Sequence, residues 1–264
     1  MVGVYAKNIS TGKTYRHNAK RVFPSASVIK LPILYLLYEE ISKGEISLEQ
    51  KISFTEKDIV DDSPYFESLV IKNGECNLYD VAHSMITVSD NTSTNLLIDL
   101  LGFDSINKKI KSLGMEQTIL NRKMCDFETR QKGIDNLTTP EDFGLFFKHI
   151  SFHLKGLTLD EILNCRFPKI SNLEEASVEM VKILSEQKDL EKIPSGFTSN
   201  KNIFVANKPG ELPNIRNDVA LIIKDEHHFV ISIFTEQVND EVRTDEIIGK
   251  FSKDLLYYLE NPSN

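Results

Sequence analysis

Cysteine and long apolar runs are both scarce in this sequence. Its three cysteines, Cys76, Cys125 and Cys165, lie far apart among 264 residues and form no C-x-x-C pair, the spacing typical of zinc sites and redox motifs. Free thiols are therefore expected, with no disulfide framework, no metal site and no cofactor. The longest apolar runs, 31–37 and 219–223, are too short to cross a bilayer, so no membrane-spanning segment is expected.

Positive charge is also lacking. The formal net charge is −8 at pH 7, which argues against a nucleic-acid binder, because such a protein needs a basic face. Hydrophobic residues make up 41% and charged residues 27% of the chain, as in ordinary globular proteins. The sequence shows no repeat, low-complexity tract or linker, and its opening Met1-Val-Gly-Val-Tyr5 indicates a strand rather than a signal peptide. A single domain is expected, and a monomer.

Strand patterns occur at both ends of the chain, and helical patterns lie between them. Alternation over 2–9 and 14–17, separated by a turn, predicts a β-hairpin. The stretch after Ser27 is apolar almost all round, which predicts a buried helix that ends near Lys43-Gly44. Further helices are predicted over 78–86, 92–101, 104–113, from 139 and over 173–184, strands over 203–206, 219–223 and 229–234 with a turn at 225–228, and a closing helix over 240–259.

This order of elements predicts an α+β fold. The terminal strands should join one antiparallel sheet that is flanked by helices, with an all-helical subdomain inserted between them. We expect the sheet subdomain to comprise about 1–45 and 195–264, and the helical subdomain about 46–194. The segment 115–139 breaks the pattern, and segments of this length without regular structure in a compact domain usually have a function.

Ser27 and Lys30 open the predicted buried helix. Their spacing places both side chains on one face of a helix, about one turn apart. A serine hydroxyl is a poor nucleophile until a base takes its proton, and a lysine can do so when burial or nearby cations lower its pKa. The helix N-terminus would add donors and positive potential for an oxyanion. The alternative is structural: Ser25 or Ser27 caps a core helix, and Lys30 extends to solvent.

Two further stretches have both a structural and a functional interpretation. Ser89-Asp-Asn91 lies between two predicted helices and contains residue types that favour capping loops. Asn207-Lys-Pro-Gly210 follows a predicted strand and could simply end it. In this order, however, S-x-x-K, S-D-N and a Lys-x-Gly triad form the motif set of class A β-lactamases and penicillin-binding proteins. The chain therefore resembles the class A β-lactamase-like serine hydrolases over nearly its whole length, which implies their α+β fold.

The resemblance implies catalytic roles for Ser27, Lys30 and Ser89. Ser27 would attack the carbonyl of a β-lactam or an acyl-D-Ala amide, and Lys30 would help to take its proton. Ser89 would relay a proton to the leaving nitrogen. The backbone N–H groups of Ser27 and Glu211 would form the oxyanion hole.

Substrate-binding roles are implied for the other matching residues. Asn91 would hold the substrate's side-chain amide and the pocket lysine Lys30. Lys208, which begins the triad that ends at Gly210, would attract the carboxylate that β-lactams and D-Ala-D-Ala peptides share. Glu211 directly follows the triad and completes this edge of the expected site.

Pro209 is the first departure from the family pattern. The family usually has Thr or Ser between the lysine and the glycine, and that hydroxyl binds the substrate carboxylate. Pro209 has neither a hydroxyl nor an N–H, so carboxylate recognition should be weaker or differently built. Arg216 could be a substitute, or it could be a solvated arginine at a strand end. A proline also fits an exposed sheet edge better than a central strand.

The second departure lies in the loop that should free the enzyme. The family has Arg-x-Glu-x-x-x-Asn before Thr-Thr-Pro, and its glutamate activates the deacylating water. Here the loop reads Arg122-Lys-Met124-Cys-Asp126-Phe-Glu128, so the glutamate position is Met124, whose thioether cannot take a proton from water. Glu128 is then the candidate general base, with Asp126 as an alternative. Either carboxylate could instead pair with Arg122 or Arg130 and hold the loop closed.

Three functions remain open from the sequence. The first is a serine hydrolase that opens β-lactams through an acyl-serine and releases the product slowly, because a general base contributes about 10²–10⁴-fold to rate. The second is a D-alanyl-D-alanine carboxypeptidase or penicillin-binding protein, and the third is a sensor domain that stays acylated. The expected partner is a small β-lactam or a D-Ala-D-Ala peptide, and the resemblance implies a secreted or extracytoplasmic location.

Overall fold

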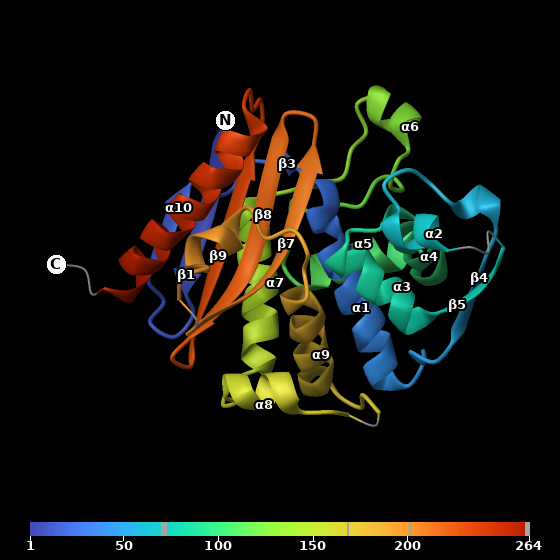
Figure 1. Ribbon diagram of the computed structural model, residues 1–264, viewed down its shortest axis with the longest axis horizontal. Coiled ribbons are helices and arrows are strands. Elements are labelled where there is room, and N and C mark those ends of the chain that lie inside the picture. Colours follow the sequence, from blue (N-terminus) through green and yellow to red (C-terminus); the bar gives the residue numbers. More distant parts are fainter. Residues whose placement is uncertain (70–72, 168, 201, 262–264) are drawn as a thin grey trace.

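The centre of the molecule is an antiparallel sheet that both ends of the chain build together. A computed structural model describes residues 1–69, 73–167, 169–200 and 202–261. The sheet has five strands in the order β2-β1-β9-β8-β7, and Figure 1 shows the N-terminal and C-terminal strands side by side. These are β1 Val2–Asn8, β2 Thr14–His17, β7 Ile203–Leu212, β8 Ile215–Lys224 and β9 His227–Thr235. The predicted α+β fold is confirmed.

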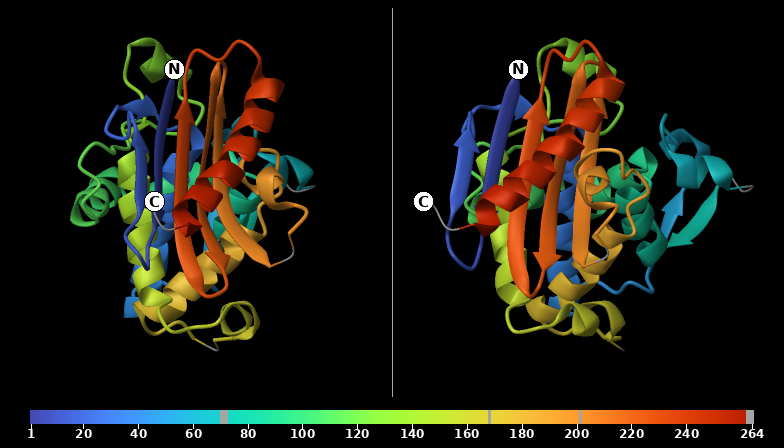
Figure 2. Two further views of the ribbon diagram at one scale, coloured as in Figure 1. Left: turned by 90° about the vertical axis from the view of Figure 1, so that its left-hand side faces the viewer. Right: turned by 60° about the vertical axis from the view of Figure 1, so that its left-hand side comes forward.

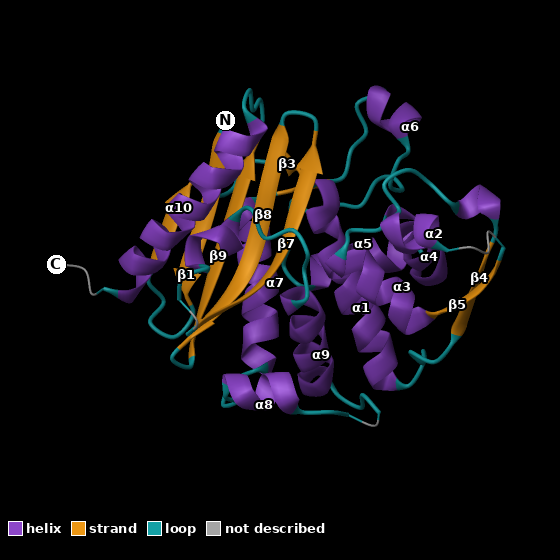
Figure 3. Ribbon diagram, in the orientation of Figure 1, coloured by secondary structure: helices purple, strands orange, loops and turns teal. Residues whose placement is uncertain are grey.

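Helices cover both faces of this sheet (Figures 2 and 3). The closing helix α10, Glu241–Glu260, lies across one face, and α7, Pro140–His153, packs against the other. Apolar side chains of α10 such as Ile248 and Leu255 are buried against strand residues such as Ile222. An apolar stripe of this kind is what an amphipathic helix buries on a sheet. No helix in the described part of the chain combines the length and apolar character needed to cross a membrane.

A helical region lies beside the sheet and is built around α1, Lys30–Lys43. Eleven of the fourteen residues of α1 are buried, as expected for a helix that is apolar all round. The helix ends at Gly44, whose φ of 80° suits a residue without a Cβ. The other helices are α2 Pro64–Ser68, α3 Leu78–Thr87, α4 Asn91–Leu101, α5 Phe103–Ser112, α6 Phe127–Gln131, α8 Leu159–Asn164 and α9 Leu173–Ser185, with the short 3₁₀ segments η1 Ala26–Ile29, η2 Glu56–Asp58 and η3 Ile193–Phe197.

The segment 46–194 differs from the prediction in two ways. It is not all-helical, because β4 Lys51–Phe54 pairs with β5 Gly74–Asn77, and β6 Leu137–Thr138 pairs with β3 Phe23–Pro24. In addition, α7 packs against β1 and β9 and so belongs to the sheet layer rather than to the inserted region. These short strands are fixed by partners far away in the sequence, which a local pattern does not reveal.

The turn between β8 and β9 is shorter than predicted. It consists of Asp225 and Glu226, whose φ angles of 47° and 63° are those of a two-residue type I′ hairpin turn. His227 and His228 were expected in this turn but are the first residues of β9. His228 is buried, and its Nδ1 lies 2.7 Å from Ser151 Oγ.

Candidate active site

The three sequence motifs meet in one cleft. It has a volume of about 430 Å³ and is lined by Ser27, Ser89, Asn91 and Glu211, among others. These residues come from η1, from the loop between α3 and α4, from the start of α4 and from β7, which is the edge strand of the sheet next to the helical region. The fold therefore brings together the residues that the sequence predicted for the site, although their motifs lie far apart in the chain.

Ser27 lies in η1, which runs directly into α1. Ser25 does not cap the helix, because its hydroxyl donates to Asn136 O at 3.1 Å and makes no cap bond. Lys30 does not reach solvent, since it is 0% exposed. The purely structural interpretation of this turn is therefore wrong on both counts.

Backbone strain is concentrated around the cleft. Four residues that line it have a left-handed backbone without being glycine: Ala26 (φ 48°), Asp62 (φ 53°), Ser89 (φ 58°) and Cys125 (φ 61°). Such conformations cost roughly 1–3 kcal/mol each and persist only where the surroundings impose them. Their presence at one place indicates that the fold holds this cleft in a defined geometry.

Lys30 points toward the S-D-N loop. Its Nζ donates to Ser89 O at 2.6 Å, to Ser89 Oγ at 3.1 Å and to Asn91 Oδ1 at 2.9 Å. Burial, followed by the nearby charge of Lys208, holds the pKa of Lys30 well below its usual value. The lowered pKa favours the neutral amine of Lys30, and a lysine must be neutral to act as a base for Ser27.

Lys208 reaches the same serine from the opposite side. Its Nζ donates to Ser89 Oγ at 3.0 Å and to Pro209 O at 3.1 Å. Burial lowers the pKa of Lys208 to about 7, and the charge of Asp218 opposes this only in part. Ser89 Oγ thus lies between two lysine amines, an arrangement that can pass a proton.

Asn91 makes the expected contact with Lys30, and both hydrogens of its side-chain nitrogen already have acceptors. Its Nδ2 donates to Asp61 O at 3.2 Å and to Cys125 Sγ at 3.4 Å. An amide nitrogen has only two hydrogens to donate. The carbonyl oxygen of a substrate amide would therefore have to replace one of these two acceptors, most simply the weakly accepting thiol.

The free edge of β7 carries the proposed second oxyanion donor. Pro209 pairs with Asp218 and has no N–H to give to β8, so this pair is of the type without mutual hydrogen bonds. Such pairs alternate along an antiparallel ladder. The pair of Glu211 with Arg216, two residues further, is consequently of the same type, and the Glu211 N–H points away from β8.

Gly210 lets this edge approach the Ser27 turn. A Cβ at Gly210 would lie 2.9 Å from Ser25 O and 3.1 Å from Val28 N. Both atoms are backbone and have no freedom to move aside. The close contact between β7 and η1 therefore requires glycine at this position.

The loop beside the cleft presents Met124, not a carboxylate. Met124 lines the cleft, and Asn95 fixes its backbone, with the N–H donating to Asn95 Oδ1 at 2.8 Å and the carbonyl accepting from Asn95 Nδ2 at 3.2 Å. Glu128 is exposed on α6, which protrudes from the body of the molecule (Figure 1), and it does not line the cleft. Asp126 caps α6 by accepting from Thr129 N at 3.0 Å.

The ion pairs that close this loop use a different carboxylate from those predicted. Asp135 contacts Arg122 at 2.7 Å and Arg130 at 3.1 Å. Asn136 completes the closure, because its Oδ1 accepts from Arg122 N and its Nδ2 donates to Arg122 O. The expectation that Asp126 or Glu128 pairs with these arginines is therefore wrong, since Asp126 is used as a helix cap and Asp135 directly precedes the closing asparagine.

Arg216 is neither in the cleft nor solvated. Its side chain is 12% exposed and pairs with Glu241, and its Nε lies 3.6 Å from Asp245. It does not line the cleft, so both sequence interpretations of Arg216 are wrong. These partners could not be predicted from the neighbouring sequence, because Glu241 and Asp245 lie on α10.

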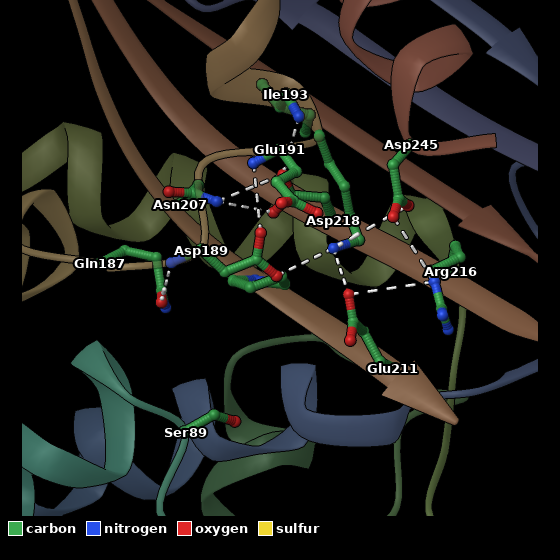
Figure 4. Close-up of polar contacts among 12 residues, drawn as sticks. Ser89, Gln187, Asp189, Glu191, Ile193, Asn207, Glu211, Arg216, Asp218 and Asp245 are labelled. Atoms are coloured by element: carbon green, nitrogen blue, oxygen red, sulfur yellow. Dashed lines mark hydrogen bonds and ion pairs between the residues drawn. The ribbon is translucent and has the colours of Figure 1, made fainter. Parts of the chain in front are cut away.

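A buried lysine that the sequence reasoning missed lies behind β7. Figure 4 shows Asp189, Glu211 and Asp245 converging on one region, away from Ser89. Lys192 is 0% exposed there and contacts Asp189 Oδ2 at 2.9 Å, Glu211 Oε1 and Asp245 Oδ1 at 3.9 Å. Burial alone would lower the pKa of Lys192, but the neighbouring carboxylates raise it above its usual value. No pattern around Lys192 distinguishes it from a surface lysine in the sequence.

Comparisons with known proteins match one family over nearly the whole chain. A family model described as "Beta-lactamase enzyme family" matches residues 1–259. Beta-lactamase BRO-1 of Moraxella catarrhalis is 22% identical over 256 residues, which cover 94% of this chain and 76% of that protein. The crystal structure of a beta-lactamase from Sphaerobacter thermophilus has a TM-score of 0.82 at 29% identity and covers 98% of this chain and 90% of that one. The structure of PBP-A has a TM-score of 0.81 at 23% identity, with coverage of 98% and 89%.

Proposed function

Since this chain belongs to the β-lactamase enzyme family, a family of serine hydrolases, we propose that β-lactams acylate it at Ser27 and that the acyl-enzyme is released slowly. The observation that carries this proposal is that Met124 lines the same cleft as Ser27, Ser89 and Glu211. The protein would then act in the manner of a penicillin-binding D,D-peptidase rather than as a fast β-lactamase.

Acylation needs a proton to leave Ser27 and a proton to reach the leaving nitrogen. Lys30, with its depressed pKa, takes the proton as Ser27 Oγ bonds to the carbonyl carbon. The proton passes through Ser89, whose hydroxyl contacts Lys30 and Lys208, to the nitrogen as the C–N bond breaks. The backbone N–H groups of Ser27 and Glu211 stabilise the oxyanion between these steps.

Deacylation would be the slow step. The carboxylates that line the cleft, Asp62, Asp189 and Glu211, come from outside the loop 122–136, and the loop presents the thioether of Met124. A water molecule beside the ester would lack the base that the loop glutamate supplies in the family, which costs about 10²–10⁴-fold in rate. A mutant of PBP-A, one of the similar folds, has been solved as an acyl-enzyme complex with penicillin G, which supports an acyl-enzyme as the stable state.

The test is to mix the protein with penicillin G and follow intact mass and hydrolysis together. We expect one penicilloyl adduct per chain, mapped to Ser27, with turnover far slower than adduct formation. Ser27→Ala should form no adduct. Ser25→Ala, two residues away, is the matched control and should still be labelled.

The other outcomes separate the remaining functions. Rapid multiple turnover without a lasting adduct would identify an efficient β-lactamase. If a stable adduct forms, release of D-Ala from an acyl-D-Ala-D-Ala peptide distinguishes a carboxypeptidase from a sensor that only binds. An unlabelled parent protein that behaves like Ser27→Ala would refute the proposal.

A further inference from the structure

A second cavity, with a volume of about 530 Å³, is formed at the C-terminal end of α7. Its other walls are the connection from α7 to α8, the residues after β1 and the turn between β8 and β9, which lie in the lower part of the molecule in Figure 1. None of the described residues that line it also lines the catalytic cleft. Its volume is within the range of small-molecule sites, so it can hold a ligand without involving the cleft.

Apolar side chains form part of the lining of this second cavity. Phe152, on the last turn of α7, lines it and is 72% exposed. Ile9 and Leu157 line it as well, from the segment after β1 and from the connection between α7 and α8. A ligand that covered these side chains would remove apolar surface from water, which is favourable. The cavity therefore suits a ligand with an apolar body.

A buried polar pair, Ser151 and His228, also lines the second cavity. The two residues are 4% and 8% exposed, and Ser151 Oγ lies 2.7 Å from His228 Nδ1. The Ser151 hydroxyl has no other acceptor among the described residues, so it donates to Nδ1, and the neutral ring then carries its hydrogen on Nε2. Burial lowers the pKa of His228, which keeps the ring neutral at neutral pH. The described residues give Nε2 no partner, and it is not fully enclosed by protein atoms, so its N–H is available to a ligand.

Positive charge predominates among the charged residues that line the second cavity. Lys148 lies on α7 and Lys155 just beyond its end, whereas Glu226 lies on the β8–β9 turn. No carboxylate of the described residues lies within 4.0 Å of either lysine amine, so both ammonium groups can pair with a ligand. Ser151 O, in the last turn of α7, accepts from Leu154 N and so is not left to repel an anion. The lining therefore favours an anion, although the chain as a whole has a net charge of −8.

We propose that the second cavity binds a small carboxylate with an apolar body, such as a medium-chain alkanoate or an arylalkanoate. The carboxylate would accept from the Nε2–H of His228 and pair with Lys148 or Lys155. The apolar body would cover Phe152 and Leu157. This site is separate from the acylation of Ser27, so either proposal can fail without the other.

The test titrates the full chain with octanoate, with 4-phenylbutanoate and with octanamide, and measures binding by calorimetry. Octanamide has the octanoate chain without the charge. We expect one site per chain and at least about fivefold tighter binding of octanoate than of octanamide, because hydrogen bonds to a charged group are the stronger ones. Salt should reduce this preference by screening the lysines. Tighter binding of 4-phenylbutanoate than of octanoate would identify an aromatic ligand, and the reverse order an alkyl ligand.

Two sets of variants locate the site. Lys148→Gln combined with Lys155→Gln should weaken octanoate binding by at least about fivefold and leave octanamide binding nearly unchanged. Lys111→Gln combined with Lys250→Gln is the matched control, because both are exposed lysines outside the cavity lining and the net charge changes equally. Phe152→Ala should weaken the binding of both ligands by about threefold or more, and the side chain that it removes is largely exposed.

Three results would overturn the inference. Octanamide that binds as tightly as octanoate would show that the site does not recognise the charge. Equal octanoate affinities of the two double-lysine variants would place the ligand outside this cavity. If the folded parent protein gives no heat of binding with octanoate or 4-phenylbutanoate at millimolar concentration, the cavity does not hold this class of ligand.

Discussion

Met124 is the residue on which turnover depends most directly. It is 8% exposed, lines the cleft and is fixed through its backbone by Asn95. The backbone at this position is therefore fixed, and the side chain that it carries determines which chemical group a water molecule in the cleft can contact. The sequence alone identified this position by counting from Arg122, and the structure puts it at the cleft.

Met124→Glu should speed deacylation. A carboxylate in place of the thioether can take a proton from water, and general bases contribute about 10²–10⁴-fold to rate. We expect the penicilloyl ester on Ser27 to be lost at least about a hundredfold faster, measured by intact mass after removal of free penicillin. Met124→Gln has the same shape without the basic group and should leave the rate close to that of the parent. Equal rates for the two variants would show that no water molecule is placed to use this carboxylate.

The sequence predicted some residues of the site and not others, and the difference has a physical basis. Ser27, Lys30 and Ser89 lie in motifs whose spacing reflects local structure, a turn that enters a helix. Lys208 was identified by its motif, although β7 continues through it to Leu212 instead of ending there. The contacts of Arg216 with Glu241, and of Lys192 with Glu211 and Asp245, depend on partners from distant elements, which the neighbouring sequence does not reveal. Glu128 was misplaced for the same reason, because α6 carries it away from the cleft.

At the scale of elements, the packing of β7 against η1 sets the geometry of the cleft. Only a residue without a Cβ fits between the strand and the Ser27 turn, because Ser25 O and Val28 N leave no room. Pro209 adds to this arrangement, since its missing N–H occurs where β7 has no bond to give to β8. The geometry of the edge strand thus depends on two neighbouring residues, Pro209, which lacks an N–H, and Gly210, which lacks a Cβ.

Gly210→Ala should therefore impair acylation more than stability. The new methyl group would push β7 away from η1 and displace the Glu211 N–H, while overpacking of this kind costs roughly 1–3 kcal/mol of folding free energy. We expect at least about a tenfold loss in the rate of Ser27 acylation, with a folded protein by circular dichroism. Gly12→Ala is the control, because a Cβ at Gly12 meets nothing within 4 Å; it should change only stability. Similar acylation rates for the two variants would refute this role of Gly210.

Element boundaries were predictable where local chemistry sets them. Thr139 and Pro140 begin α7, with Thr139 Oγ1 accepting from Asp142 N, and Gly44 ends α1. The pairing of β4 with β5 was not predicted, because both segments are mostly polar and their buried residues, Phe54 and Cys76, are held by packing into the core. The turn predicted over 225–228 was two residues too long, because His227 and His228 pair with Lys224 and Ile223 in the sheet, which two polar residues do not signal.

For the whole molecule, joining both chain ends in one sheet places charged groups in the interior. Lys30 and Lys208 are buried beside Ser89, where β7 meets the helical region, and Lys192 and Asp218 are buried on the side of η3 and α10. Burial raises the pKa of Asp218 to about 7 and lowers that of Lys208 to about 7. The fold therefore binds protons differently from the unfolded chain, and its stability must depend on pH.

Asp218→Asn should remove part of this dependence. In the folded protein Asp218 keeps its proton up to about pH 7, whereas in the unfolded chain it loses it near pH 4. Between these values the folded state binds more protons, so the free energy of unfolding of the parent falls as pH rises. An asparagine does not bind or lose a proton in this pH range. We therefore expect the free energy of unfolding of the variant, relative to that of the parent, to rise by on the order of 2–4 kcal/mol from pH 4 to pH 7.

The side chains around Asp218 can accept this substitution. Ile193 N donates to Asp218 Oδ2 at 3.0 Å, and the amide oxygen of asparagine can replace that acceptor. Asn207 Oδ1 has no partner among the described residues, so a flip of the Asn207 amide would receive the new N–H donor. The measurement is urea unfolding of both proteins at several pH values from 4 to 7. If the free energies of unfolding of the two proteins change with pH in parallel, Asp218 is ionised in the folded protein and is stabilised by Lys192 and Lys208.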